Sequence, residues 1–445
     1  MDIVQVSRTV LIDLAALKVF SGLKQHPLLG ALRDLLEALP GESSALVGRW
    51  SSFMSLFVKY NRNYSFYDTM AELVLRDENP FTLRAEQAGA SGVDSVLLVL
   101  SGNDLVRLGR IAALDLSELA ACVARRLEAV DGEAKLTDAE AAVLRAAEGN
   151  AGSGAGAFFV RGSRWGEGLR EFAGYIRDNG AGLLGVYPSF RWNLKEGGLR
   201  PVANPDPVVQ ADLYGYEAQR SVVVSNTFKF LEGRPANNLL LYGDRGTGKS
   251  ATIKAVCGEY AGRGLRLLEV RKEDLSELPV IMETLGRRAP RFVVFIDDLA
   301  FEAVDASFTA LKALLEGGVE RRPPNAVIYA TSNRRHLVKE RHSDRAVNDD
   351  VRDFDTMQEQ LSLSDRFGLT VVFSSPTQEE YLEIAEYIAV RRGILSGGAS
   401  PAAEASRRLY RENALRWERW FNGRSPRTAV QYADWAAGGE AFPWE

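Results

Sequence analysis

After residue 209, five apolar runs alternate with segments in which apolar residues recur at helical spacing. The runs cover residues 237–243, 265–270, 291–298, 325–333 and 368–375. Continuous apolar runs of this length are typical of strands buried on both faces of a parallel sheet. The helices between them suit the crossovers that parallel strands need. The pattern therefore predicts an α/β fold with a five-stranded parallel sheet between helices.

The first 200 residues have a mainly helical pattern. Asp115 precedes apolar residues at helical spacing, and together with Glu118 it resembles a capping box. The run at 96–100 fits either a strand or a buried helix. Other segments with a helical pattern are 28–39, 65–75 and 167–178.

The boundary between these two regions is expected in residues 191–208. This segment contains two glycines, three prolines and little periodicity, which is typical of a linker. From about residue 376 the pattern is again only helical. We therefore expect a mainly helical N-terminal domain (1–200), an α/β core (201–376) and a small helical lid (377–445).

Composition narrows the class of protein. The formal net charge is −5, with 25% charged and 46% hydrophobic residues, so the overall charge does not support binding to nucleic acid or to an anionic membrane. The chain has two cysteines, which fits a reducing compartment, and its three histidines lack the spacing of a zinc site. The N-terminus lacks the pattern of a signal peptide, and no apolar run has membrane-spanning length. We expect a cytoplasmic protein.

The strongest chemical signal is the sequence GDRGTGKS at residues 243–250. It matches the phosphate-loop pattern G-x-x-x-x-G-K-S, with a predicted strand before it and a predicted helix after it. Glycines let the backbone N–H groups point at phosphates, Lys249 supplies a cation, and the Ser250 hydroxyl is suited to Mg²⁺. The motif predicts Mg-ATP as the bound cofactor. The predicted nucleotide-binding residues of the loop are Gly243, Asp244, Arg245, Gly246, Thr247, Gly248, Lys249, Ser250 and Ala251. Of these, Asp244 and Arg245 are expected to face solvent.

Two acids follow the predicted strand at 291–296. Asp297 stands at the carboxyl end of the strand, about 50 residues after the phosphate loop. A carboxylate in that position holds Mg²⁺ through its water shell, so Asp297 and Ser250 are the expected metal residues. Asp298 follows directly and is a candidate for polarising water.

Beyond these two motifs the chain resembles the AAA+ ATPases over residues 209–440. Asn333 ends the fourth predicted strand, where that family has the sensor 1 residue that orients water. Arg366, in LSDRFG, resembles the arginine finger of the initiator and helicase-loader group, and Arg427, in GRSPRTAVQY, resembles the sensor 2 arginine. Gly215 and Tyr216 match the segment that lies against adenine. The whole chain looks closest to a bacterial family of AAA+ ATP-binding proteins, the domain of unknown function 815.

The chain departs from the AAA+ pattern in three places. The second acid after the strand is usually Glu, whereas here it is the shorter Asp298. Glu302 is therefore an alternative for polarising water, and a third alternative is that no side chain does so. Residues 270–279 lack the aromatic pore loop of threading unfoldases. A charged insertion at 334–364 is either solvated or an arm that docks a partner.

The segment 406–427 combines seven arginines with Tyr410, Trp417, Trp420 and Phe421. Such a composition suits single-stranded nucleic acid, but Tyr410, Trp417 and Phe421 share one helical face with Ala414. We favour a lid core over a binding surface.

Three functions remain to be compared. The resemblance implies an ATP-hydrolysing switch that assembles head-to-tail through Arg366, as a ring or spiral, and acts on an unidentified protein client. An ATP-dependent scaffold with weak hydrolysis is the alternative, because Asp298 is shorter than Glu. A small-molecule kinase leaves Asn333, Arg366 and Arg427 unexplained.

Overall fold

The computed structural model describes residues 3–60, 65–127, 139–144, 165–195, 197–299, 322–333, 366–396, 400–421 and 423–438, with a few isolated positions between these ranges. The chain divides into two compact units, Met1–Val186 and Tyr187–Glu445. The second unit begins earlier than the boundary expected at residue 201.

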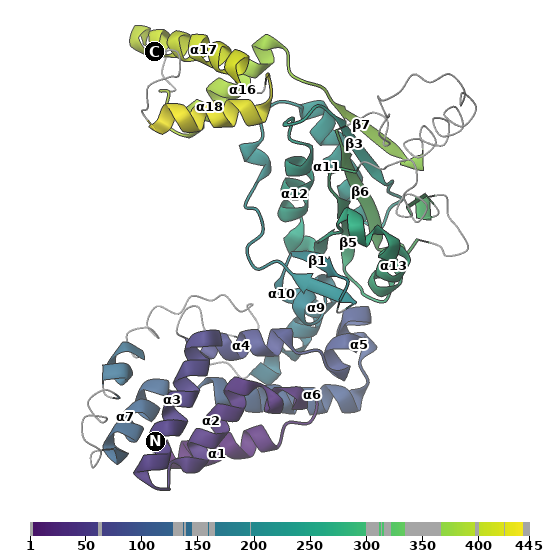
Figure 1. Ribbon diagram of the computed structural model, residues 1–445. Helices are drawn as coiled ribbons and strands as arrows, with labels where there is room; N and C mark the ends of the chain where they lie inside the picture. The colour runs from purple at the N-terminus through teal and green to yellow at the C-terminus, as the bar shows by residue number, and fades with distance from the viewer. Residues whose placement is uncertain are drawn as a thin grey trace, which may run out of the picture. The chain divides into compact units, whose positions relative to one another are not determined.

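The first unit is helical throughout its described residues (Figure 1). The run at 96–100 lies in helix α6, which resolves the ambiguity of its pattern. Asp115 caps α7 by accepting hydrogen bonds from the N–H groups of Ser117 and Glu118. The helices are α1 (Ile3–Ala15), α2 (Pro27–Ala38), α3 (Ser43–Tyr60), α4 (Phe66–Arg76), α5 (Pro80–Ala88), α6 (Ser95–Ala112), α7 (Leu116–Arg126), α9 (Leu169–Asn179) and α10 (Leu183–Val186).

The second unit is built on a mostly parallel sheet in the order β2-β1-β4-β5-β6-β3-β7. The strands are β1 (Ser189–Asn193), β2 (Gly198–Pro201), β3 (Leu239–Gly243), β4 (Leu265–Glu269), β5 (Arg291–Ile296), β6 (Ala326–Ser332) and β7 (Leu369–Phe373). The last five are the strands predicted from the apolar runs. They are mutually parallel in the order β4-β5-β6-β3-β7.

The sheet has seven strands rather than the predicted five, because the expected linker at 191–208 holds the end of β1 and all of β2. β1 pairs parallel with β4, and β2 pairs antiparallel with β1. Phe190 and Trp192 are buried while Arg191 between them is exposed, which is the two-residue alternation of a strand. The glycines and prolines after them obscured this short pattern.

Helices cover both faces of the sheet (Figure 1). α11 (Glu217–Leu231) and α12 (Lys249–Glu259) pack on the face that carries Leu239, Leu241 and Val293. α13 (Leu278–Gly286) packs against β6. The strands are therefore buried on both sides, as their continuous apolar runs require.

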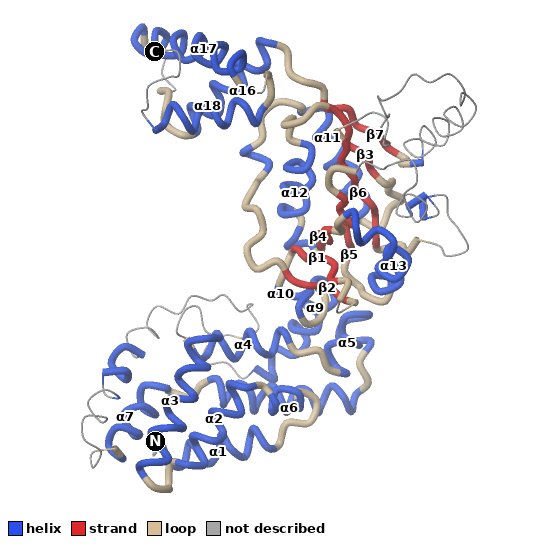
Figure 2. Tube along the Cα trace, in the orientation of Figure 1, coloured by secondary structure: helices blue, strands red, loops and turns tan. Residues whose placement is uncertain are grey.

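The chain ends in three helices, α16 (Gln378–Arg391), α17 (Pro401–Trp420) and α18 (Pro426–Gly438), which Figure 2 shows as an all-helical cluster beyond the last strand. Tyr410, Ala414 and Trp417 are buried in the core of this cluster. Phe421 packs against Trp417 with the ring centroids 4.2 Å apart, but it is 41% exposed, so it lies at the edge of the core rather than in it.

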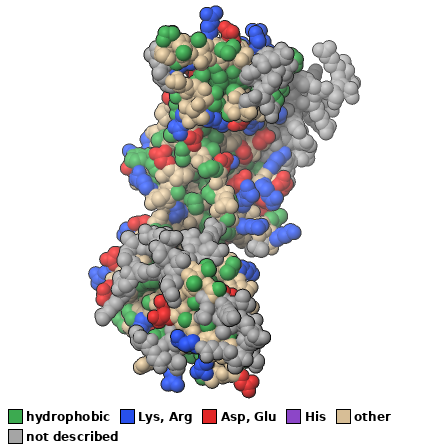
Figure 3. Space-filling view, turned by 90° about the vertical axis from the view of Figure 1, so that its left-hand side faces the viewer, with side chains coloured by type: hydrophobic (Ala, Val, Ile, Leu, Met, Phe, Trp, Pro, Cys, Tyr) green, Lys and Arg blue, Asp and Glu red, His purple; other side chains and the backbone are tan. Residues whose placement is uncertain are grey.

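Charged side chains of both signs are interspersed over the face seen in Figure 3. Within the described parts of the chain, no helix combines the length and the apolar character needed to cross a bilayer.

Candidate nucleotide site

The phosphate loop joins β3 to α12, and the backbone at three of its positions requires glycine. Gly243 has a φ of +140°, and a Cβ there would lie 2.0 Å from the carbonyl oxygen of Phe373. Gly246 and Gly248 also have positive φ, at +78° and +93°. A Cβ on Gly246 would lie 2.8 Å from Ser425 Oγ. Any side chain at these positions would strain the loop or push neighbours away.

Lys249 opens α12 and is nearly buried, with 6% of its surface exposed. Its Nζ donates to the carbonyl oxygens of Gly243 (3.0 Å) and Asp244 (2.6 Å) and to Asn333 Oδ1 (3.1 Å). Burial lowers the pKa of Lys249, while the carboxylates around it act in the opposite direction. The ammonium group is thus held at the phosphate loop by these three acceptors.

Asp297 follows β5 and faces the start of α12. Its Oδ1 accepts hydrogen bonds from Ser250 Oγ and from Thr331 Oγ1, both at 2.6 Å. A carboxylate and a hydroxyl that converge at the mouth of a phosphate loop are the hard oxygen ligands that Mg²⁺ prefers. The chemistry of these donors therefore fits a magnesium ion held by Ser250 and Asp297.

Asp298 has an unusual backbone for a residue other than glycine, with a φ of +50°. Its Oδ1 accepts a hydrogen bond of 2.6 Å from Asn333 Nδ2. Asn333 therefore contacts both Lys249 and Asp298, so the two polar residues expected at neighbouring strand ends lie together. Left-handed backbone at such a residue costs about 1–3 kcal/mol, and this kind of strain concentrates at functional sites.

The opposite end of the site is aromatic and apolar. Tyr216 immediately precedes α11 in a left-handed conformation (φ 60°), after Gly215 at φ +77°. The Tyr216 ring stacks on Phe373 at 5.2 Å, and its hydroxyl donates to the Ser374 carbonyl at 2.7 Å. Burial raises the pKa of Tyr216 to about 12, so the hydroxyl stays protonated as a donor. A flat heterocyclic base suits this end.

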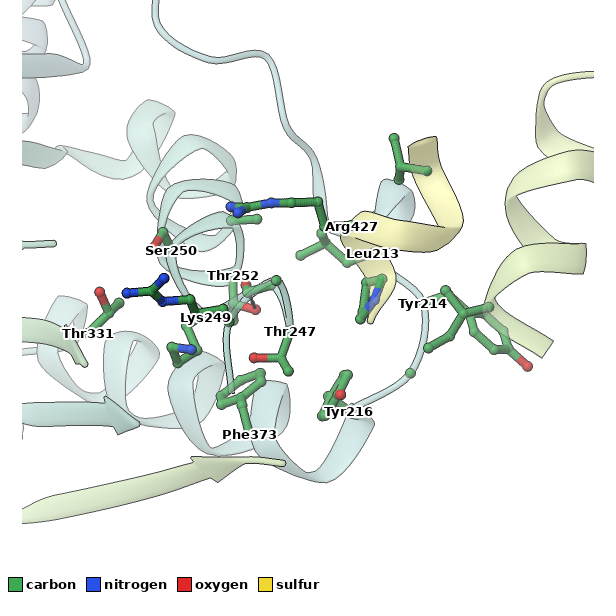
Figure 4. A pocket seen from close by; sticks show the side chains of 18 of the residues that line it. Leu213, Tyr214, Tyr216, Thr247, Lys249, Ser250, Thr252, Thr331, Phe373 and Arg427 are labelled. Carbon is green, nitrogen blue, oxygen red and sulfur yellow. Dashed lines mark hydrogen bonds between the residues drawn. The ribbon is translucent and has the colours of Figure 1, made fainter. Parts of the chain in front are cut away.

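The two ends belong to one cavity of about 620 Å³. Figure 4 shows Lys249, Ser250 and Thr331 at one end of the cavity and Tyr214 and Tyr216 at the other. Pockets of this size bind small ligands or cofactors. The cavity therefore offers a charged end for phosphates and an aromatic end for a base.

The helical cluster closes the cavity at α18. Arg427 lies in the first turn of α18, lines the cavity, and donates its backbone N–H to the Gly246 carbonyl at 3.2 Å. Tyr214 stacks on Tyr387 of α16 at 4.6 Å. Each contact joins a residue that lines the cavity to the helical cluster.

Asp244 is exposed, as expected from the sequence, and it also makes a contact that the sequence did not indicate. Its Oδ2 accepts hydrogen bonds from the N–H and the hydroxyl of Ser375, both at 2.7 Å. These two donors lower the pKa of the Asp244 carboxyl. The variable position of the phosphate loop thus anchors the segment that connects β7 to α16.

The remaining predicted residues divide into three groups. Arg245, Thr247 and Ala251 line the cavity with the rest of the loop. Arg366 lies just before β7 and is not among the described residues that line the cavity. Glu302 and the insertion at 334–364 lie outside the described residues.

Sequence reasoning missed Thr331 and Phe373. Phe373 ends β7 and lies against Tyr216, and Thr331 contacts Asp297 from β6. The position of Thr331 could have been inferred from the parallel pairing of β5 with β6, which sets the residue beside Asp297. No motif marked either residue.

The fold and the site together define a class. The parallel core has the order β4-β5-β6-β3-β7, with a phosphate loop between β3 and α12, acids after β5, a polar residue after β6 and a helical cluster at the C-terminal end. This arrangement is a P-loop fold of the AAA+ type. The family model described as "Protein of unknown function (DUF815)" matches residues 186–440. The chain belongs to this family.

Other relatives match less of the chain. Human replication factor C subunit 4 is 33% identical over 111 residues, which cover 21% of this chain and 31% of that protein. A variant of Thermotoga maritima RuvB is 17% identical, with a TM-score of 0.33, over 51% of this chain and 63% of its own. The Aeropyrum pernix ORC1 protein in complex with DNA is 16% identical, with a TM-score of 0.36, over 53% of this chain and 64% of its own. The chain spans less than two thirds of each of these proteins.

Proposed function

We propose that this chain binds Mg-ATP in the cavity between the sheet and the lid and hydrolyses it to ADP and phosphate. The observation that carries the proposal is the convergence of Lys249, Ser250, Asp297, Asp298 and Asn333 at one end of the cavity. These side chains come from three separate elements of the fold, and each has the chemistry that phosphoryl transfer uses.

Each residue has a distinct role in this proposal. Lys249 and the loop N–H groups bind the β- and γ-phosphates, and Arg427 approaches the same end from the lid. Ser250 and Asp297 hold Mg²⁺, which neutralises phosphate charge when bound. Asp298 accepts a proton from the attacking water, and Asn333 orients that carboxylate through its 2.6 Å hydrogen bond.

We further propose that nucleotide state controls assembly or the remodelling of a protein partner. The lid contacts both ends of the cavity, through Arg427 and through Tyr387. A change in the ligand is therefore transmitted to the lid orientation. Arg366 would act on the nucleotide of a neighbouring copy, which implies a head-to-tail ring or spiral.

The second candidate is a scaffold that binds ATP to assemble and hydrolyses it poorly. It is favoured by the engagement of Asp298, whose short side chain already accepts a hydrogen bond from Asn333. A carboxylate held in this way reaches less far than the longer Glu. Both candidates require ATP binding, and they differ in turnover.

Two measurements on the purified full chain separate these candidates. The particle mass should rise with ATP relative to ADP under either of them. Phosphate release at saturating Mg-ATP should continue over many turnovers for the ATPase, whereas it should stop near one phosphate per chain for the scaffold. A chain with the same mass in ATP and ADP would contradict nucleotide-controlled assembly.

A further inference from the structure

Thr331 is a buried threonine at the rim of the nucleotide cavity, with 2% of its surface exposed. It lies in β6 one residue beyond Ala330, which pairs with Ile296 at the end of β5, so Thr331 is level with Asp297. Neither the phosphate-loop motif nor the acids after β5 account for a hydroxyl here.

Thr331 makes three hydrogen bonds to three consecutive residues. Its Oγ1 donates to Asp297 Oδ1 at 2.6 Å and accepts from the N–H of Asp298 at 2.9 Å. Its carbonyl oxygen accepts from the N–H of Leu299 at 2.7 Å. The hydroxyl thus uses both its donor and its acceptor on the two acids of the site.

These bonds explain how the strained turn at Asp298 persists. A φ of +50° at a residue other than glycine needs surroundings that hold it in place. Thr331 fixes the backbone on both sides of Asp298, and this sets the direction in which the short carboxylate leaves the chain. Asn333 meets that carboxylate at 2.6 Å.

The same hydroxyl fixes the orientation of Asp297. One oxygen of its carboxylate accepts from both Thr331 and Ser250 at 2.6 Å. Hydrogen bonds of this kind to a metal-binding carboxylate commonly set its orientation and tune the affinity for the metal.

We propose that Thr331 is a positioning residue that aligns both acids, Asp297 toward the metal and Asp298 toward water. The proposal rests on the proposed function of the site. It also gives a reason why an Asp, rather than the longer Glu, can polarise water at the position after Asp297. The turn held by Thr331 directs the backbone of Asp298 so that its shorter side chain extends to the water.

Thr331→Val tests the proposal because it keeps the shape of the side chain and removes the hydroxyl. Thr331→Ser keeps the hydroxyl. Thr227→Val is the matched control, because Thr227 is a buried threonine with hydrogen bonds to Val223 and Tyr329 and does not line the cavity. Each full-length variant is measured for ATP affinity with Mg²⁺ and with EDTA, for phosphate release and for melting temperature.

Thr331→Val should lower kcat roughly 10- to 100-fold and reduce the gain in ATP affinity that Mg²⁺ gives, while affinity in EDTA stays near that of the wild type. Thr331→Ser should restore both quantities. Thr227→Val should lower only the melting temperature. If Thr331→Val does not fold, Thr331→Ala is measured in the same way, and the result for Thr331→Ser still counts.

Two results would overturn the proposal: a Mg²⁺ response and kcat unchanged in Thr331→Val, or a loss in Thr331→Ser as large as in Thr331→Val. With either result the wild type still binds Mg-ATP, so the proposed function of the site stands and only the proposed role of Thr331 is refuted. A wild type that binds no ATP would overturn the proposed function itself.

Discussion

Lys249→Ala removes the one ammonium group that reaches the floor of the cavity from α12. In the structure this group donates to two backbone carbonyls and to Asn333, and it is 6% exposed. Because water does not reach it well, its attraction to phosphate oxygens is only weakly screened. A hydrogen bond with a charged partner contributes about 1.5–3 kcal/mol net. At about 1.4 kcal/mol per tenfold, the Kd for Mg-ATP should rise roughly 10- to 150-fold.

The matched control is Lys254→Ala on the same helix. Lys254 pairs with Asp206 at 3.6 Å and does not line the cavity, so its loss should leave the Kd unchanged. Titration of a fluorescent ATP analogue into each purified chain gives the Kd, and a thermal melt shows whether the variants are folded. A folded Lys249→Ala chain with the Kd of the wild type would refute the assignment of the phosphate site.

Three other changes test separate parts of the account. Asp298→Asn should slow phosphate release far more than it weakens ATP binding, because it removes a group used at the chemical step; equal losses in both measurements would contradict this. Arg366→Ala should lower the rate of phosphate release roughly 10³-fold or more, because its arginine would act on the nucleotide of a neighbouring copy. Mixing this variant with Lys249→Ala should restore phosphate release. An Arg366→Ala chain with full activity would exclude a shared site. Asp244→Asn should lower the melting temperature at neutral pH, since the Ser375 donors lower the carboxyl pKa and stabilise its charged form. That difference should shrink as the pH falls below 3.8 and the carboxyl takes up a proton, and melts across a pH series that show a constant difference would contradict it.

The core of the fold was predictable because its signals are local. Each of the five apolar runs became a strand, since a strand buried on both faces needs no polar alternation. β1 and β2 were missed because only Phe190 and Trp192 carry the alternation, and the glycines and prolines that follow indicate a linker. A pattern of four or five residues is too short to outweigh such neighbours.

The residues of the site also differ in whether a local sequence signal predicts them. Lys249, Ser250 and Asp297 belong to motifs whose residues are close in sequence or end a predicted strand, so their meeting could be expected before the structure was known. The bond between Asp244 and Ser375 joins residues far apart in sequence and depends on the path of the chain after β7. The hydroxyl of Thr331 depends on strand register and on a turn of positive φ, neither of which composition indicates.

Single-turnover hydrolysis shows whether this cavity binds and hydrolyses Mg-ATP, as we propose. Labelled ATP is incubated with an excess of the purified full chain, with Mg²⁺ or with EDTA, and with the Lys249→Ala chain in parallel. We expect ADP and free phosphate from the wild type with Mg²⁺, and intact ATP in both other reactions. Equal product from the wild type and Lys249→Ala, or ATP that stays intact on a wild-type chain shown to bind it, would contradict the claim.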